Sequence, residues 1–307
     1  MNKIFDKRGQ ALTAMPTVDD DPRDFVEVDL SQNQLTELPG NLHQFTHLQS
    51  FSIYDNHLTA LPEALWQLTK LQALNVSANR LALLSDKIGV LTKLQILDVA
   101  HNRLTALPEA IGTLQKLKFL YAGDNPLTSI PDSFSQLTNL IYLNLTDTLM
   151  TSLPDGIGKL LNLIELRLYN SQLAALPETL GQLTNLRELH AMKNQLAALP
   201  ASIGNLTSLR KLSLEGNQLT ALPEAMGNLA NLTDLDLRHN KLAALPESLG
   251  NLRNLRYLDL RANHLKTLPA NLAALPALEK LDLRWNKLTA LPAWLEHLEA
   301  RGCVVYC

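Results

Sequence analysis

The stretch LTDLDLRHNKLAALPESLGNLRN, residues 232–254, is one copy of a unit that recurs every 23 residues through most of the chain. One asparagine marks each copy, and its positions are separated by 23 residues or a multiple of 23. The series comprises Asn33, Asn56, Asn79, Asn102, Asn125, Asn194, Asn217, Asn240, Asn263 and Asn286, with Thr148 and Ser171 in the two remaining places. Such a fixed period without insertions predicts a stack of identical structural units.

The first part of the unit predicts a short strand, because apolar and polar residues alternate there with a period of two. In the quoted copy, Leu235 and Leu237 should point inward, while Asp234, Asp236 and Arg238 should point outward. Successive strands should pair in parallel about 4.8 Å apart. The strands of the repeats should therefore form one continuous parallel sheet.

The second part of the unit predicts a turn and a covering layer. The buried asparagine should bond backbone groups where the chain leaves the sheet, since an unpaired buried polar group costs about 1–3 kcal/mol. A proline follows in nearly every copy, interrupted only at Ser85, and it presets the backbone for a helical turn. The apolar residue before the following glycine, as in Ile111-Gly112, should then cover the back of the sheet.

Composition narrows the possible functions. The formal charge of −3 lacks the basic excess that nucleic-acid binders carry, so we expect no nucleic-acid partner. No apolar run approaches the roughly 20 residues of a membrane span, and residues 1–10 lack the apolar core of a secretory signal. The only cysteines, Cys303 and Cys307, could not staple an N-terminal cap, which favours a reducing cytoplasm. Secretion as an effector without a cleavable signal stays open.

The ends of the array are irregular copies of the unit. We predict a single domain over residues 1–307, with a degenerate cap unit at 1–24, twelve repeats at 25–300 and a degenerate terminal strand at 301–307. Adding 23 to Leu281 and Leu283 places Val304 and Tyr306 at leucine positions of that strand. Its open edge could pair with another chain. We expect a monomer, with an end-to-end dimer, a frayed terminus or a lost partner domain as alternatives.

The unit resembles the leucine-rich repeats of plant intracellular Ras-group proteins, animal Ras-suppressor and scaffold proteins, and bacterial cytoplasmic repeat proteins. This resemblance implies an α/β solenoid, a curved horseshoe with a parallel concave sheet and short helical or 3-10 turns on its convex side. It also implies a non-catalytic scaffold that binds a protein partner through the concave face, in signalling or host contact. The alternative is the substrate-recognition arm of a ubiquitin ligase or kinase whose catalytic part is absent from this chain.

Residues that the repeat does not dictate are the candidates for partner binding. Aromatic and large apolar side chains occupy such positions in the middle of the array, and solvent-facing aromatics on a rigid sheet are typical of interaction hot spots. The predicted contact residues are Ile96, Phe119, Tyr121, Tyr142, Tyr169 and Met192, with Asp98, His101, Arg167 and His190 beside them. The alternative is that cross-strand aromatics only stabilise a long sheet.

Two further features each allow two interpretations. Thr148 and Ser171 could loosen the turns near the aromatic residues, or their hydroxyls could serve the same backbone groups as asparagine. Toward the C-terminus, aspartates and arginines recur at two outward positions, namely Asp236, Asp259 and Asp282 with Arg238, Arg261 and Arg284. They could neutralise one another, or the three arginines could hold an acidic or phosphorylated ligand.

We expect no enzyme activity, cofactor or metal site. The sequence has no nucleophile elbow, phosphate-binding loop or zinc-protease motif. His101 with Asp98, Asp124 and Asp147 could outline a metal site, but these positions are open and flat and lack the enclosure that a site requires. Cys303 and Cys307 should lie about 13 Å apart on one face of a strand, too far for a disulfide and too few for a zinc site.

Overall fold

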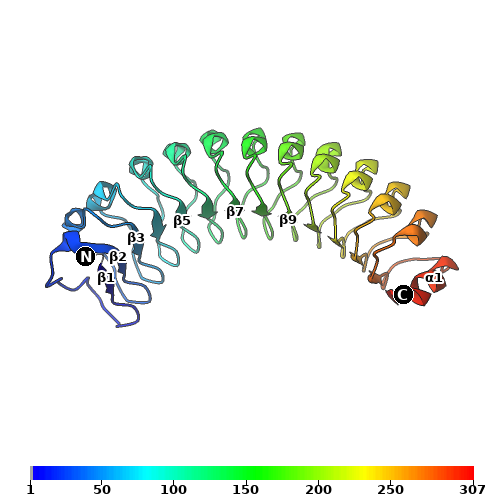
Figure 1. The fold of residues 1–307 in the computed structure, drawn as a ribbon, viewed down its shortest axis with the longest axis horizontal. Helices are drawn as coiled ribbons and strands as arrows, with labels where there is room; N and C mark the ends of the chain where they lie inside the picture. Colours follow the sequence, from blue (N-terminus) through cyan, green and yellow to red (C-terminus); the bar gives the residue numbers. More distant parts are fainter. Residues whose placement is uncertain (1–2) are drawn as a thin grey trace. The chain divides into compact units, whose positions relative to one another are not determined.

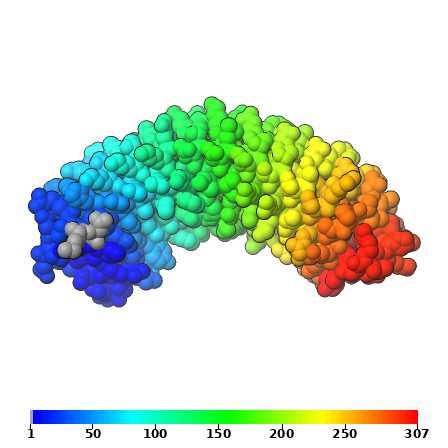
Figure 2. Space-filling model, in the orientation of Figure 1, coloured from blue at the N-terminus to red at the C-terminus, as the bar shows by residue number. Residues whose placement is uncertain are grey.

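The computed structural model describes residues 3–307, and the chain divides into two compact units, of which the first ends at Leu149 and the second spans Met150–Cys307. In each unit short parallel strands line one side, and short helices lie behind them (Figure 1). The space-filling view shows the repeats of each unit packed against one another without gaps (Figure 2). The predicted parallel sheet with 3-10 turns is therefore confirmed.

The strands and the 3-10 helices, labelled η, alternate along the chain. Those of the first unit are β1 (Lys3–Asp6), η1 (Pro22–Asp24), β2 (Phe25–Asp29), η2 (Leu42–Gln44), β3 (Ser50–Ser52), η3 (Glu63–Gln67), β4 (Ala73–Asn75), η4 (Asp86–Val90), β5 (Ile96–Asp98), η5 (Glu109–Thr113), β6 (Phe119–Tyr121), η6 (Asp132–Gln136) and β7 (Tyr142–Asn144). Those of the second unit are η7 (Asp155–Lys159), β8 (Glu165–Arg167), η8 (Glu178–Gln182), β9 (Glu188–His190), η9 (Ala201–Asn205), β10 (Lys211–Ser213), η10 (Glu224–Asn228), β11 (Asp234–Asp236), η11 (Glu247–Asn251), β12 (Tyr257–Asp259), η12 (Ala270–Ala274), β13 (Lys280–Asp282), the α-helix α1 (Trp294–Ala300) and β14 (Val304–Tyr306).

The period of 23 residues sets the strand register. Leu97 of β5 pairs with Leu120 of β6, and Leu235 of β11 pairs with Leu258 of β12. The central apolar residue of each repeat strand is buried, as is the apolar residue two positions later, so Leu235 and Leu237 point inward as predicted. The first and third residues of each strand therefore form rows along the open face of the sheet, the face turned away from the 3-10 helices.

The asparagine series forms a hydrogen-bonded ladder beneath the sheet. Asn102 Nδ2 donates to the carbonyl oxygens of Val76 at 3.0 Å, Val99 at 3.1 Å and Ala100 at 3.0 Å. Its Oδ1 accepts from the backbone N–H of Leu81 in the preceding repeat at 2.9 Å. The predicted role of the asparagine is confirmed, because each copy ties its own turn to the turn before it.

The exceptions in the repeat keep the local geometry. Thr148 is buried, and its Oγ1 donates to the Leu145 carbonyl at 3.3 Å, so a hydroxyl serves a group that asparagine serves elsewhere. Pro108 precedes η5 with a φ of −71°, the value that proline favours. Ser85 stands in the proline position before η4, and its side chain accepts from the N–H of Lys87 at 3.2 Å. Serine thus caps the turn that proline begins in other repeats.

The register predicted for the terminal strand is wrong by one residue. Val305, not Val304, pairs with Leu281, and Tyr306 pairs with Asp282. The reason is α1, a seven-residue α-helix in place of the usual five-residue 3-10 helix, followed by Gly302 with a φ of +89°. This connection is one residue longer, so Val304 and Tyr306 lie exposed on the open face.

The two terminal segments contain elements beyond the repeats. Residues 1–24, predicted as a degenerate cap, include the strand β1, which pairs with β2 and places Asp6 opposite Asp29. At the other end, Cys303 is buried and Cys307 is exposed, and both thiols are free.

Candidate functional site

Four of the predicted contact residues lie together on the open face of the first unit. Ile96 pairs with Phe119, and Phe119 pairs with Tyr142, so these three form one row across β5, β6 and β7. Tyr121 lies beside this row, and its ring centroid is 4.9 Å from that of Tyr142, with the ring planes tilted by 38°. The Ile96 side chain is 41% exposed and the three rings are half-buried. We call these four residues the aromatic surface.

A groove adjoins the aromatic surface on its N-terminal side. It has a volume of about 360 Å³ and is lined by Gln49, Ser50, Gln72, Ala73, Gln95, Ile96, Lys118 and Phe119. The small side chains of Ser50 and Ala73 stand in the same row as Ile96 and Phe119, and this step in size creates the hollow. Amide groups line one rim, because Gln72 bonds Gln49 at 3.2 Å and Gln95 bonds Gln72 at 3.3 Å. We call it the glutamine groove.

Acidic groups lie along the opposite edge of the aromatic surface, where the strands end. Asp98 pairs with Tyr121 in register and accepts from the Ala100 N–H at 3.0 Å. Burial raises the pKa of Asp98 above its ordinary value. His101 Nδ1 lies 3.4 Å from Asp124 Oδ2, and both side chains are exposed. The structure therefore places Asp98 and His101 beside the aromatic surface, as the sequence predicted.

The other four predicted residues belong to the second unit. Tyr169 follows β8 and Met192 follows β9, each two residues after the end of its strand, whereas Phe119 and Tyr121 lie within β6. Arg167 pairs with His190 in register between β8 and β9. Tyr169 and Met192 thus occupy a different repeat position from the four residues of the aromatic surface, although the sequence predicts all six as one cluster.

Arg167 and His190 take part in a local ionic cluster. Ligand atoms of Glu165, Glu188 and His190 lie within 4.8 Å of one another, a spacing that could suit a metal ion. However, Arg167 Nε already contacts Glu165 Oε1 at 2.6 Å, and Lys211 Nζ lies 3.7 Å from Glu188 Oε1. These cations compensate the two carboxylates, so we interpret the cluster as an ion-pair network.

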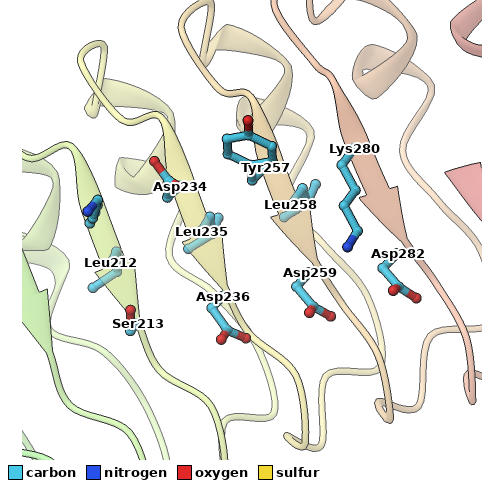
Figure 3. Close-up of a pocket in the computed structure, with 11 residues that line it drawn as sticks. Leu212, Ser213, Asp234, Leu235, Asp236, Tyr257, Leu258, Asp259, Lys280 and Asp282 are labelled. Carbon is cyan, nitrogen blue, oxygen red and sulfur yellow. The ribbon is translucent and has the colours of Figure 1, made fainter. Parts of the chain in front are cut away.

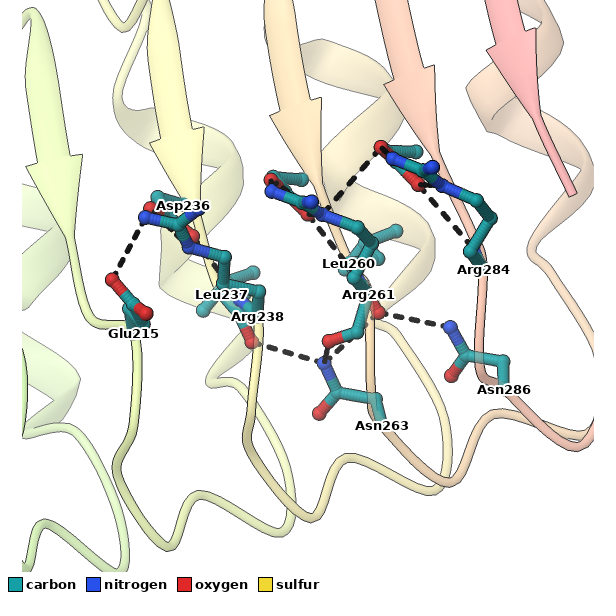
Figure 4. Close-up of polar contacts among 11 residues, drawn as sticks. Glu215, Asp236, Leu237, Arg238, Leu260, Arg261, Asn263, Arg284 and Asn286 are labelled. Carbon is teal, nitrogen blue, oxygen red and sulfur yellow. Dashed lines mark hydrogen bonds and ion pairs between the residues drawn. The ribbon is translucent and has the colours of Figure 1, made fainter.

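The aspartates and arginines of the second unit form the ladder shown in Figure 4. Arg261 and Arg284 each bond the aspartate of their own strand at 2.6 Å, namely Asp259 and Asp282. Arg238 is shared between Asp236 at 3.2 Å and Glu215 at 2.8 Å. Neutralisation within the chain, one of the two sequence interpretations, therefore accounts for all three guanidinium groups.

A second groove lies beside this ladder (Figure 3). Its volume is about 360 Å³, and its lining includes Lys211, Asp234, Tyr257 and Lys280. Tyr257 is 39% exposed, and its hydroxyl donates to Glu279 at 2.9 Å. The wall is mixed in charge and has no apolar cluster comparable to the aromatic surface.

Sequence reasoning gave little weight to the exposed aromatics at the C-terminal end. Trp285 is 67% exposed and Tyr306 is 41% exposed, more than the rings of the aromatic surface. The Arg284 guanidinium lies 5.5 Å from the Trp285 ring centroid and 4.8 Å from that of Tyr306. Trp285 holds the repeat position directly before Asn286, so the sequence alone could have marked it as a large side chain at a variable position. The exposure of Tyr306 could not be predicted in this way, because it depends on the register of β14.

The buried carboxylate of the ladder gives a pH-dependent prediction. The Asp282 side chain is only 1% exposed and pairs with Arg284. Burial raises its pKa, but the hydrogen bonds and charge of Arg284 outweigh this effect and hold the pKa below its ordinary value. A carboxyl with a lowered folded pKa stabilises the fold above its unfolded pKa of about 3.9, and this stabilisation is lost as the pH falls through the folded value.

We therefore expect Asp282→Asn to lower the free energy of unfolding by about 1.5–3 kcal/mol at neutral pH, the range for a hydrogen bond to a charged group. Urea titrations should show the full difference from wild type above about pH 5 and a smaller one below about pH 4. Asp155→Asn, at an exposed position of η7, is the control and should leave stability unchanged. A difference that persists undiminished at about pH 2 would contradict the assignment.

With this geometry in place, the sequence was compared with protein-family models. A model described as "Leucine rich repeat" matches residues 26–81, 92–150, 198–242 and 243–288, which together cover more than half of the chain. A second model, "Leucine-rich repeat region", matches residues 132–216. The chain belongs to the leucine-rich-repeat family. Both models describe repeats and neither describes a catalytic domain, so this leucine-rich-repeat protein has the fold of a protein-interaction scaffold.

Solved structures of other leucine-rich-repeat proteins resemble the chain. A leucine-rich-repeat protein of Leptospira interrogans is 33% identical, with a TM-score of 0.79, over 97% of this chain and 82% of its own. The plant peptide hormone receptor RGFR1, solved in complex with RGF2, is 28% identical with a TM-score of 0.77, and the match covers 87% of this chain and 45% of the receptor chain. YopM from Yersinia enterocolitica is 28% identical with a TM-score of 0.64, over 92% of this chain and 60% of its own.

No curated protein matches the sequence. The leucine-rich-repeat chain spans less than half of the RGFR1 chain and less than two thirds of YopM. Within residues 3–307, none of the helices has the length and apolar character that crossing a membrane requires.

Proposed function

We propose that this leucine-rich-repeat protein is a non-catalytic scaffold that binds a protein partner through the open face of its sheet, with the aromatic surface as the principal contact. The observation that carries the proposal is the cluster of Phe119, Tyr121 and Tyr142 beside the exposed Ile96. Aromatic side chains with few rotatable bonds, held on a rigid sheet, lose little entropy on binding and dominate interface energies.

The chemistry of the aromatic surface favours binding over a purely structural role. The sheet is already held by backbone pairing and by buried apolar side chains, and most of its other strands carry small or charged residues at the same positions, with Tyr257 of β12 as a further ring. Bulky rings there add little that the fold requires. The glutamine groove next to them offers both amide donors and acceptors, which match the polar groups of a peptide backbone.

A structure of similar fold and the cysteine content of the chain both support this proposal. The RGFR1 structure, similar in fold, contains a leucine-rich-repeat receptor bound to RGF2. We further propose that Tyr169, Met192, Arg167 and His190 contribute a contact on the second unit. The cysteines of the chain, Cys303 and Cys307, could not staple an N-terminal cap, which supports a reducing compartment such as the cytoplasm, where we propose that a monomeric scaffold acts in signalling or host contact.

The double variant Tyr121→Ala/Tyr142→Ala tests the proposal. It should weaken partner binding at least tenfold, because truncating an interface hot spot typically costs more than about 1.4 kcal/mol, a factor of ten in affinity. The full chain would first capture partners from a cell lysate. A purified captured protein would then be titrated by calorimetry against wild type and variant.

Tyr54→Ala is the matched control, because Tyr54 is 38% exposed on the first unit but lies outside the aromatic surface. Its affinity should stay at the wild-type level, and thermal melts should show that both variants remain folded. Equal affinity of the double variant and wild type would refute the assignment of the aromatic surface.

A further inference from the structure

The first unit carries a formal excess of acidic residues. Up to Leu149 the chain has 16 Asp and Glu against 11 Lys and Arg, a formal charge of −5, whereas the second unit has 14 against 16, a charge of +2. Surface charge of one sign attracts partners of the opposite sign and speeds their association. Residues 1–50 hold most of this excess, with 8 Asp and Glu against 4 Lys and Arg, but Asp98 and Asp124 lie beside the aromatic surface. These two aspartates bear on which partner the aromatic surface accepts, an inference that rests on the proposed function.

Most ion pairs of the first unit lie away from the aromatic surface. Lys3 pairs with Asp20 and Asp24, and Arg8 pairs with Asp6 near β1. On the 3-10 side, Lys87 pairs with Glu63. These contacts neutralise carboxylates at the N-terminal end and behind the sheet, whereas the ion pair beside the aromatic surface is that of Asp124 with the imidazole of His101.

The acidic edge itself contains carboxylates that would gain from a cationic partner. Burial raises the pKa of Asp98 and of Asp124, and the nearby charge of Asp147 raises that of Asp124 further. His101 is the ion-pair partner of Asp124 at 3.4 Å, and Lys118 lies across the surface in the glutamine groove. Carboxylates form strong charge-assisted hydrogen bonds when a guanidinium or ammonium group approaches.

We propose that the partner presents a basic segment to the first unit, with an Arg or Lys side chain at Asp98 and Asp124 and a neighbouring apolar side chain in the glutamine groove against Ile96 and Phe119. Ile96 and Asp98 are two residues apart in β5, which is roughly 7 Å at about 3.3 Å per residue. An extended partner segment spaces its own alternate side chains by the same distance. The expected recognition element is therefore an apolar residue, any residue, and then Arg or Lys.

A phage-displayed library of random 12-residue peptides, selected on the full chain, tests this inference. Enriched peptides should carry Arg or Lys two positions from an apolar residue, and synthetic copies should bind at least tenfold more weakly to Asp124→Lys. Asp132→Lys is the matched control, since Asp132 lies exposed on η6 behind the sheet and the change in net charge is identical. Raising the salt concentration should also weaken binding, because the charged contacts are solvent-accessible.

The outcomes separate this inference from the proposed function on which it rests. Acidic or uncharged peptides whose binding is lost in Tyr121→Ala/Tyr142→Ala would overturn the basic partner and leave the aromatic surface standing. Basic peptides that bind Asp124→Lys and Asp132→Lys equally would also overturn it. Peptides that bind the tyrosine double variant as tightly as wild type would overturn both.

Discussion

Replacing Asn102 with alanine is expected to lower the free energy of unfolding by about 3 kcal/mol, because a buried N–H group loses its acceptor and several hydrogen bonds disappear. The Leu81 N–H, in the preceding repeat, bonds Asn102 Oδ1 at 2.9 Å. The carbonyls of Val76 and Val99 retain a second donor from neighbouring asparagines, Asn79 and Asn125. The main loss therefore falls on the link between two adjacent repeats.

Asn102→Thr is the matched comparison, since the chain itself places Thr148 at the equivalent position of another repeat. A threonine hydroxyl can still donate to the carbonyl three residues earlier, as Thr148 Oγ1 does to Leu145 at 3.3 Å. We expect Asn102→Thr to cost about half as much as Asn102→Ala, measured by urea unfolding with circular dichroism. Equal costs for the two variants would show that the asparagine bonds contribute little beyond filling space.

The repeated part of the fold was predictable because every structural role recurs at the same position. Alternation marked Leu235 and Leu237 as inward, and the burial of a polar residue at a fixed position required Asn240 to bond the backbone. Each copy of the unit confirms the others, so a single irregular residue such as Ser85 does not disturb the prediction. Local pattern and tertiary packing agree throughout the array, which is the condition under which sequence specifies structure.

At the C-terminal end, the 23-residue period predicts the strand register wrongly. Counting 23 residues onward assumes that the connection keeps its length, but α1 and Gly302 lengthen it by one residue. A shift of one residue turns each strand side chain to the other face. Tyr306 therefore faces solvent next to Arg284 and does not face the core. No periodic pattern in the sequence predicts this orientation.

The candidate site was predictable in part for a related reason. Phe119, Tyr121 and Tyr142 lie at strand positions whose outward direction follows from the alternation. Tyr169 and Met192 lie beyond the strand ends, where direction depends on the turn and not on a period of two. The sequence alone could not decide whether the arginines of the ladder pair with its aspartates or bind an acidic ligand. The distances from Arg261 to Asp259 and Asp282 show that this guanidinium group is already paired.

Gly204→Ala should lower the free energy of unfolding by about 3 kcal/mol, the upper range for overpacking a close-packed site. A Cβ atom at Gly204, in η9, would clash with the carbonyl oxygen of Ala225 in the next repeat and would lie 2.8 Å from the Cβ atom of the same residue. Removing glycine from a helical turn normally stabilises by up to about 1 kcal/mol through the unfolded chain. The destabilisation from the clash is larger than this gain. The clashing group is the backbone of Ala225 rather than the end of a flexible side chain, so the two repeats must move apart.

Gly40→Ala separates the steric clash from the effect on the unfolded chain, because nothing lies within 4 Å of a Cβ atom added at Gly40. That variant should match wild type or exceed it slightly in urea unfolding, whereas Gly204→Ala should unfold at clearly lower urea concentration. Adding Ala225→Gly to Gly204→Ala should recover part of the loss, since it removes one of the two contacts and frees the opposing backbone. If Gly204→Ala proved as stable as Gly40→Ala, the 3-10 helices could not be as closely stacked as the structure places them.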